Sequence, residues 1–114
     1  MSTDTLTSTG KRQDRDQPWL ICRHCRSQLA PSASPGGAFV NPIGHVHDLV
    51  VAPCAPGAEA AGPVTTAFSW FPGYGWQLAF CRRCGSHVGW CYLATGPQRP
   101  DLFFGLRRDA LGVP

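Results

Sequence analysis

Apolar residues alternate with polar or small residues over short stretches of the chain and do not recur at helical spacing. Trp76, Leu78 and Phe80, for example, are each separated by one other residue. This period of two predicts β-strands. Proline, glycine or polar turns bound four such stretches, which are residues 64–70, 75–80, 87–93 and 102–106. We therefore expect an all-β fold.

A hairpin is also expected over residues 38–51. Its centre, Asn41-Pro42-Ile43-Gly44, is typical of a turn between two short extended pieces. Residues 31–38 and 52–63 are crowded with glycine, proline, alanine and serine, so we expect loops there. The segment 109–113 is too short to assign.

The composition agrees with short strands in one small domain. The chain has 114 residues, and its 13 glycines and 11 prolines disfavour long helices. Residues 1–17 are almost entirely polar and lack the apolar side chains that would offset the entropy of ordering them. We expect a flexible N-terminal tail over 1–17 and a folded domain over 18–114.

The charge pattern limits the classes of partner. The formal net charge is +3, which is too small and too scattered to predict a nucleic-acid partner. No stretch reaches the roughly 18 apolar residues of a membrane span, and the N-terminus lacks the apolar run of a signal peptide. We expect a cytoplasmic protein with no membrane partner, so its cysteines are expected to be metal ligands or free thiols.

Two Cys-x-x-Cys units stand far apart in the chain. Fifty-five residues separate Cys25 from Cys81, far more than in a zinc ribbon. Because tetrahedral Zn²⁺ is held by four thiolates in structural sites, we predict one such site. The ion would join distant segments and make the fold depend on it. The predicted ligands are Cys22, Cys25, Cys81 and Cys84.

The other cysteines, histidines and basic residues near this site have less specific patterns. Cys54 lies in an Ala/Pro/Gly-rich stretch, and we interpret it as incidental. Cys91 alternates with Trp90 and Tyr92, which predicts an inert buried thiol. We expect charge compensation from the arginines that flank the metal, which are Arg23, Arg26, Arg82 and Arg83. We interpret His24 as a residue at the surface or beside the metal that does not bind it, because it would have to displace a cysteine. We expect ordinary structural roles for His45, His47 and His87.

Three of the four tryptophans lie close together in the pattern. Pro72-Gly73 is typical of a tight turn, and it separates Trp70 from Trp76. Trp90 would come across to Trp76 if the strands over 75–80 and 87–93 pair. The three indoles are then either core residues or a shallow aromatic box open at one end, where their N–H groups find partners.

An aromatic box has two possible guests. A methylated ammonium would use the negative faces of the rings, whereas a neutral ring would use dispersion and backbone hydrogen bonds. Cation cages commonly add a carboxylate, but residues 64–100 contain neither Asp nor Glu. The local sequence therefore favours the neutral guest.

With these residues in view, the chain resembles the CULT domain family, the thalidomide-binding region of cereblon, and above all its short stand-alone bacterial members. The resemblance covers roughly residues 21–111. It lies in CRHC, in Asn41-Pro42 followed by Gly44-His45-Val46-His47, in FSWFPGYGW, in CRRCGSHVGW and in FFGL.

The resemblance implies a β-tent, in which two antiparallel sheets meet at an angle and are pinned by one zinc ion on four cysteines. It also implies a three-tryptophan cage for a cyclic imide such as glutarimide, whose imide edge would bond to the backbone of Phe68 and Trp70. The human member of the family has a histidine where this chain has Phe68, so the resemblance implies no side-chain hydrogen bond at this position. The implied ligand-binding residues are Asn41, Pro42, Phe68, Ser69, Trp70, Trp76, Trp90 and Tyr92.

The expected function is therefore non-catalytic binding of an uncharged cyclic imide or a ureide-like ring of the uracil or hydantoin type, free or as a cyclised peptide terminus. A related zinc-pinned enzyme, methionine-R-sulfoxide reductase, is an alternative. It would need a catalytic cysteine in an Arg-x-Cys-x-Asn pattern, and Cys91 lies in Gly-Trp-Cys-Tyr-Leu instead. A zinc-tent protein that binds nucleic-acid ends would need a basic concave face, which the charge pattern disfavours.

Overall fold

The computed structural model describes residues 18–113, and within them the chain forms two antiparallel sheets. The tail expected over 1–17 lies outside the described residues. The strands are β1 (Leu20–Cys22), β2 (Gln28–Ala30), β3 (Ser34–Val40), β4 (Val46–Ala52), β5 (Ala58–Thr65), β6 (Tyr74–Cys81), β7 (His87–Ala94), β8 (Leu102–Arg107) and β9 (Leu111–Gly112), with one short 3-10 turn, η2 (Arg108–Ala110). The all-β prediction is confirmed.

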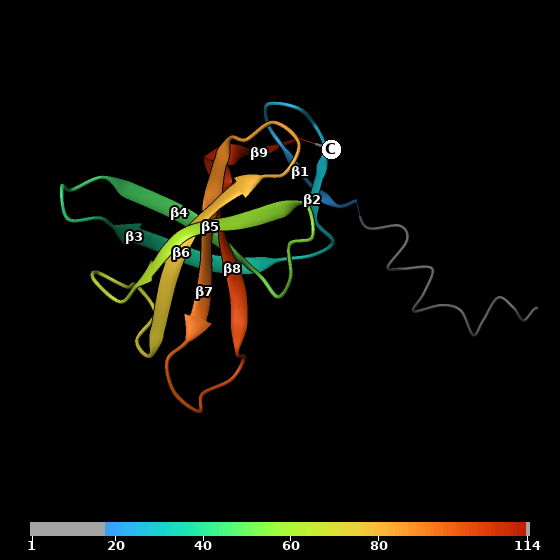
Figure 1. Ribbon diagram of the computed structural model, residues 1–114. Coiled ribbons are helices and arrows are strands. Elements are labelled where there is room, and N and C mark those ends of the chain that lie inside the picture. The colour runs from blue at the N-terminus through green and yellow to red at the C-terminus, as the bar shows by residue number, and fades with distance from the viewer. Residues whose placement is uncertain (1–17, 114) are drawn as a thin grey trace, which may run out of the picture.

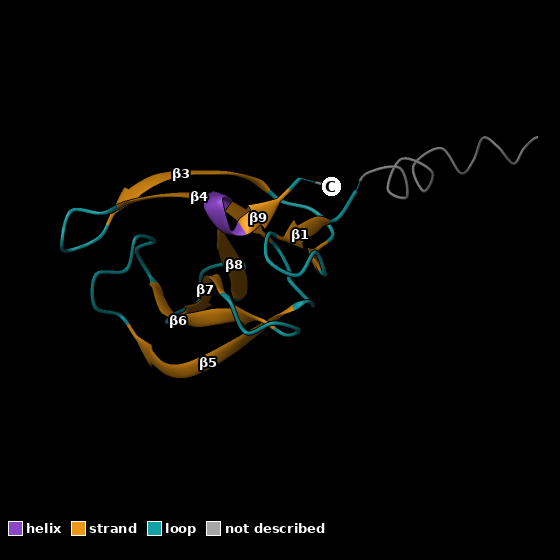
Figure 2. Cartoon of the chain, turned by 90° about the horizontal axis from the view of Figure 1, so that it is seen from above, coloured by secondary structure: helices purple, strands orange, loops and turns teal. Residues whose placement is uncertain are grey.

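The larger sheet has the order β3-β4-β8-β7-β6-β5, and the smaller has the order β2-β1-β9 (Figure 1). Every neighbouring pair is antiparallel. Figure 2 shows that the larger sheet is strongly curved, with the β3–β4 hairpin on one side, β5 and β6 on the other, and β7 and β8 between them. This curvature lets segments that are far apart in sequence face each other.

Two groups of buried side chains fill the fold. The larger group packs between the two sheets and contains Cys22, Leu29, Ala30, Val50, Ala52, Ala55, Ala58, Ala79, Cys81, Val88, Leu106 and Ala110. The smaller group is aromatic and contains Tyr74, Tyr92 and Phe103, with Phe71, Trp76 and Trp90 packed against it. Trp76 and Trp90 thus pack against the smaller core, which adjoins the aromatic site described below.

The two expected loops are partly wrong. β3 begins at Ser34, inside the expected loop 31–38, and β5 occupies 58–65, mostly inside the expected loop 52–63. Both are the edge strands of the larger sheet and are largely exposed. An edge strand needs neither a buried face nor a full ladder of N–H donors, so glycine, alanine and proline are tolerated there.

The strand expected over 64–70 is also wrong, because β5 ends at Thr65. The Thr65 hydroxyl accepts a hydrogen bond from the Ala67 N–H at 3.1 Å. Phe68 then adopts a φ of +56°, in the left-handed region that no strand uses. The aromatic residues after Thr65 therefore project from a loop.

The hairpin over 38–51 and the Pro72-Gly73 turn are confirmed. β3 and β4 pair from Ser34 opposite Val51 to Val40 opposite Val46. Gly73 has a φ of +87°, and the Tyr74 N–H donates to the Phe71 carbonyl at 3.0 Å. Among residues 18–113, no helix has the length and apolarity needed to cross a membrane.

Candidate metal centre and aromatic pocket

The four cysteines of the two Cys-x-x-Cys units come together between the two sheets. Their sulfur atoms all lie within 4.8 Å of one another. Cys22 Sγ is 3.7 Å from Cys84 Sγ, and Cys25 Sγ is 3.6 Å from Cys81 Sγ. Four sulfurs placed tetrahedrally about 2.3 Å from one ion would be about 3.8 Å apart. The four cysteines are therefore close enough to hold one metal ion, and the spacing fits zinc.

The two units are structural copies of each other. In the first, the Cys22 carbonyl accepts from the Arg26 N–H at 2.9 Å; in the second, the Cys81 carbonyl accepts from the Gly85 N–H at 2.8 Å. Arg26 and Gly85 both have positive φ, +67° and +79°. Glycine adopts this conformation without strain, whereas Arg26 does so at a cost of roughly 1–2 kcal/mol. The repeated turn is therefore imposed by the site.

Two serines that we did not predict support the sulfurs. Ser27 Oγ lies 3.1 Å from Cys25 Sγ and 3.4 Å from Cys81 Sγ. Ser86 Oγ lies 3.2 Å from Cys84 Sγ. The sequence does contain a signal for them, because CRHCRS and CRRCGS share the longer pattern Cys-Arg-x-Cys-x-Ser.

Hydrogen bonds and burial set the protonation of the thiols in opposite directions. Burial alone would raise the pKa of Cys81, but the Ser27 hydroxyl and two backbone N–H groups lower it to about 6. The Ser86 hydroxyl lowers the pKa of Cys84, whereas burial raises that of Cys22 to about 11. Metal binding displaces the remaining protons, since the thiolate is the ligand.

Arg23 and Arg82 form hydrogen bonds that link the two Cys-x-x-Cys units to neighbouring backbone. The backbone N–H of Arg23 donates to the Ala110 carbonyl at 3.0 Å, and that of Arg82 donates to the Gly57 carbonyl at 2.9 Å. The Arg82 guanidinium also reaches the Pro56 carbonyl at 3.0 Å. Each unit is thus tied to a neighbouring segment of backbone.

The predicted aromatic residues surround a pocket of about 290 Å³ on the curved face of the larger sheet. Trp76 lies opposite Tyr92 in the β6–β7 pair, and Trp90 lies opposite Leu78, so Trp76 and Trp90 are diagonal neighbours. The expected pairing of the two strands is confirmed. The lining residues are Asn41, Pro42, His47, Phe68, Trp70, Trp76, Trp90 and Tyr92.

Two of the indoles form a corner. The rings of Trp70 and Trp90 are 5.2 Å apart at an interplanar angle of 78°. No stacking contact of Trp76 with either ring occurs among residues 18–113. Tyr92 also lines the pocket and is only 2% exposed. Burial raises the pKa of its phenol, which stays neutral. The indoles therefore leave a gap between them.

Backbone carbonyls hold the indoles in place. Trp70 Nε1 donates to the Val40 carbonyl at 3.1 Å, and Trp76 Nε1 donates to the Ala67 carbonyl at 2.8 Å. Trp70 also stacks on Phe39 of β3, with ring centroids 5.3 Å apart. The loop 66–73 is thus attached to the β3–β4 hairpin, which lies across from it in Figure 2.

His47 lines the pocket although we expected only a structural role for it. Its ring lies 5.6 Å from that of Trp70 and 5.2 Å from that of Trp90. Burial lowers its pKa, as do the nearby His45 and Arg107. No alternation of apolar and polar residues marks His47, and its neighbours Val46 and Asp48 near the tip of the hairpin are both exposed. The candidate Ser69 stands just outside the lining, where its hydroxyl donates to the Phe71 carbonyl at 3.1 Å.

The two other cysteines and His24 belong neither to the four-sulfur cluster nor to the pocket lining. Cys54 is exposed. Cys91 is 2% exposed, and burial raises its pKa, which is the opposite of what activates a thiol. His24 is exposed within the first Cys-x-x-Cys unit.

No protein-family model matches the chain. It is 44% identical to cereblon of Gallus gallus over 102 aligned residues and 37% identical to cereblon of Danio rerio over 102. Each of these alignments covers 81% of the chain. Cereblon of Drosophila yakuba is 35% identical over 123 aligned residues, which cover 98% of the chain. The chain is a cereblon-like domain.

The cereblon-like domain is much shorter than these relatives. The aligned region spans 23% of the Gallus gallus protein, 24% of the Danio rerio protein and 21% of the Drosophila yakuba protein. The likeness therefore concerns about a quarter of each relative.

Proposed function

We propose that the aromatic pocket binds an uncharged cyclic imide or a similar ureide-like ring and that it does so without catalysis. The observation that carries this proposal is the pocket itself, which three indoles and a neutral phenol line. Its volume of about 290 Å³ lies at the small end of the range of small-molecule sites, roughly 300–1,000 Å³. This size suits one small ring better than an extended ligand.

The charge of the lining supports a neutral guest. None of the lining residues is acidic, and the two that titrate, His47 and Tyr92, are both held toward their neutral forms. A cation would have no carboxylate partner in the pocket, and an anion would have no cation. Apolar contact with the ring faces is the main source of affinity that remains.

The backbone beside the pocket supplies groups for an imide edge. Within residues 18–113, no hydrogen bond engages the backbone N–H or carbonyl of Phe68 or the backbone N–H of Trp70. An imide presents one N–H between two carbonyls, so it needs one acceptor and up to two donors. These groups match that pattern, and the side chain of Phe68, 73% exposed, lies at the mouth.

The same proposal includes zinc as the metal and places the domain in the CULT family. The four-cysteine set and the sulfur spacing support zinc, which prefers tetrahedral thiolate sites. With all four positions taken by sulfur, the ion would be structural and would leave no open position for a substrate. The buried Cys91, whose pKa is raised, also supports a non-catalytic domain.

A tryptophan-fluorescence titration of the zinc-loaded protein with glutarimide and succinimide tests this function. We expect saturable quenching in the wild type and in a Trp19→Ala control, since Trp19 lies outside the pocket. Trp76→Ala and Trp90→Ala should each weaken binding by about 30-fold or more, as for buried aromatic anchors.

Three results would contradict the proposal. The first is a flat titration of folded, zinc-loaded wild type. The second is unchanged affinity in both pocket variants. The third is preferential binding of tetramethylammonium, which would support the cation cage. Consumption of methionine sulfoxide with a thiol reductant would support the enzyme alternative.

A further inference from the structure

The wall of the pocket formed by Trp90 is supported from behind by a histidine that does not line the pocket. The ring of His87 meets the indole of Trp90 edge-on, with centroids 5.1 Å apart and an interplanar angle of 84°. Trp70 and His47 contact the same indole on the pocket side. The orientation of Trp90 therefore depends on where the His87 ring is held.

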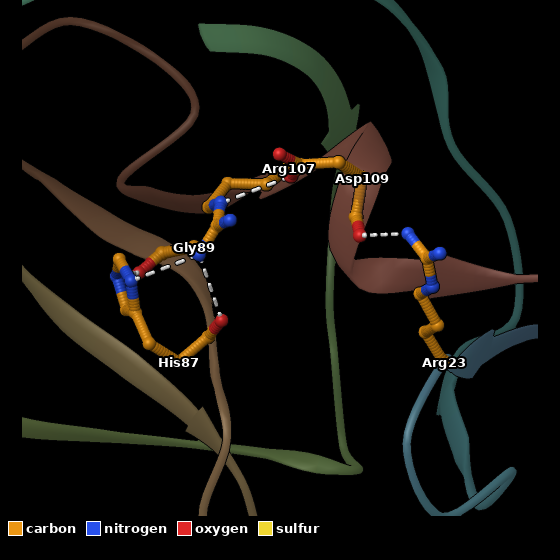
Figure 3. A network of polar contacts seen from close by, with 5 residues as sticks. All are labelled: Arg23, His87, Gly89, Arg107 and Asp109. Atoms are coloured by element: carbon orange, nitrogen blue, oxygen red, sulfur yellow. Dashed lines mark hydrogen bonds and ion pairs between the residues drawn. The ribbon is translucent and has the colours of Figure 1, made fainter. Parts of the chain in front are cut away.

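Both ring nitrogens of His87 are engaged (Figure 3). Nε2 lies 2.8 Å from the Gly89 carbonyl, which only accepts, so Nε2 carries the proton. Nδ1 lies 3.3 Å from Arg107 Nη1, which only donates, so Nδ1 is the bare acceptor. These two partners select one neutral tautomer and fix the plane of the ring.

Arg107 is itself held in place. Nη1 also donates to the His87 carbonyl at 3.2 Å, and Nε donates to Asp109 Oδ1 at 3.1 Å. The Arg107 side chain is 25% exposed, and its bond to Asp109 lowers the pKa of that carboxyl. The Asp109 carbonyl accepts from the Arg23 guanidinium at 3.3 Å (Figure 3). The network thus runs from the first Cys-x-x-Cys unit to the back of Trp90.

The backbone at Trp90 has little freedom to move if the His87 ring is displaced. Gly89 precedes it, and a Cβ at Gly89 would lie 2.1 Å from the Gly105 carbonyl oxygen. β7 is therefore packed directly on β8 at this point. Because the backbone is fixed, any change in the position of the indole must come from side-chain rotation, which the His87 ring restricts.

We propose that His87 and Arg107 are positioning residues: together they set the angle of the Trp90 indole and thereby the affinity of the pocket for a cyclic imide, which neither residue touches. The effect on affinity rests on the function proposed above, whereas the effect on Trp90 does not. Neither residue was predicted to serve the site, because β8 and the start of β7 meet only in the folded sheet.

The test compares Arg107→Met, which keeps the length of the side chain and removes its donors, with Arg107→Lys, which keeps a cationic donor. Arg108→Met is the matched control, since Arg108 pairs with Asp48 at 3.2 Å and does not contact His87. The first readout needs no ligand: ¹⁵N NMR of the histidine rings reports the His87 tautomer, and the Trp90 indole signal and its Overhauser contacts with His87 report the ring geometry. The second readout is titration with glutarimide.

In the wild type we expect the Nε2–H tautomer at neutral pH and close contact between the two rings. In Arg107→Met the tautomer preference should be lost and the Trp90 signal should shift or broaden. The affinity for glutarimide should fall about three- to tenfold, as for the loss of one or two hydrogen bonds. Arg107→Lys should recover part of the affinity, and Arg108→Met should match the wild type.

The proposal is overturned if Trp90 and His87 give the same spectra in Arg107→Met as in the wild type. It is also overturned if Trp90 moves while the affinity stays unchanged, or if Arg108→Met loses as much affinity as Arg107→Met. If the wild type shows the expected ring geometry and its loss in Arg107→Met but binds no glutarimide, the proposed function fails and the positioning of Trp90 stands.

Discussion

The imidazoles of His47, which lines the pocket, and of His87, which supports its wall, are held toward their neutral forms. Burial and the Arg107 guanidinium lower the pKa of His87, and His47 adds to this effect, while the hydrogen bond to the Gly89 carbonyl and the Asp109 carboxylate oppose it. Burial also lowers the pKa of His47, next to His45 and Arg107. In the unfolded chain both histidines titrate near pH 6.5. As the pH falls below about 6.5, the unfolded chain therefore binds protons at these two imidazoles more readily than the folded domain does.

This difference gives a pH dependence with a definite sign. A lowered folded-state pKa contributes stability above the unfolded value, and that stability is lost as the pH falls through the folded value. We expect the melting temperature to fall between pH 7 and pH 5, and to fall less steeply in His87→Gln, which has no imidazole to protonate. Thermal unfolding measured across this range checks the expectation. Because the cysteines titrate in both proteins, equal slopes would contradict it.

Gly89 permits the close packing of β7 on β8. A Cβ there would lie 2.1 Å from the Gly105 carbonyl oxygen, and neither backbone can move without breaking the ladder. We expect Gly89→Ala to lower the free energy of unfolding by about 1–3 kcal/mol or more, as in overpacked cores. Gly96→Ala is the control, since a Cβ at Gly96 meets only the flexible end of Gln98. Denaturant unfolding of both variants tests this prediction. Equal free energies of unfolding for the two variants would be inconsistent with this packing.

At the scale of elements, the tip of the β3–β4 hairpin is fixed by one side chain. Asn41 Oδ1 accepts from the Ile43 N–H at 3.1 Å and from the His45 N–H at 2.8 Å. The Gly44 N–H donates to the Asn41 carbonyl at 2.9 Å. Pro42, which lines the pocket, is thus held within a closed turn.

Replacement of Asn41 should therefore loosen the rim of the pocket. Asn41→Ala removes an acceptor shared by two N–H groups, and we expect a loss of about 1 kcal/mol in stability together with weaker binding of glutarimide. Asn41→Asp keeps the acceptor oxygen and should retain most of both. Chemical denaturation and ligand titration of the pair test this role. Equal behaviour of the alanine and aspartate variants would show that the turn forms without the side-chain bonds.

The central strands were predictable from the sequence and the edge strands were not. Residues 75–80, 87–93 and 102–106 form β6, β7 and β8 almost as expected, because these segments carry the buried apolar side chains and are bounded by glycine, proline or polar turns. β3 and β5 have one neighbour each, so their glycines, alanines and prolines suggested loops. A periodic pattern is imposed only where packing requires it.

Some residues of the candidate site were likewise predictable from the sequence and others were not. The cysteines and tryptophans were found because metal-ligand spacing and clustered indoles are local features of the sequence. His47, His87 and Arg107 were missed because their partners are distant in sequence and are brought close only by the curvature of the sheet and by the β7–β8 pairing. Long-range geometry of this kind leaves no periodic signal.

At the scale of the whole molecule, the cysteine cluster connects the two sheets. Cys22 ends β1 in the smaller sheet, and Cys81 ends β6 in the larger one. The apolar core beside them is built largely from alanine and other small side chains. We therefore expect the domain to depend on a metal ion that joins these segments.

Removal of the metal should unfold the domain cooperatively. Structural zinc contributes on the order of 10 kcal/mol, which is comparable to the whole stability of about 5–15 kcal/mol of a typical domain. We expect one zinc per chain by elemental analysis, and loss of the β-sheet circular dichroism and of the dispersed NMR signals on chelation. Cys81→Ser should behave like the chelated protein, and Cys54→Ser like the wild type, since Cys54 lies outside the cluster. A folded, metal-free wild type would contradict this dependence.

The central claim is that a neutral aromatic pocket, held open by the metal-dependent scaffold, recognises the edge and the faces of an imide ring. Calorimetric titration of the zinc-loaded domain with glutarimide and, in parallel, with N-methylglutarimide tests it most directly. We expect one glutarimide per chain and binding of the methylated ring weaker by about tenfold or more, because methylation removes the N–H and leaves a backbone acceptor unpaired. No heat of binding for glutarimide, or equal affinity for both rings, would contradict the claim.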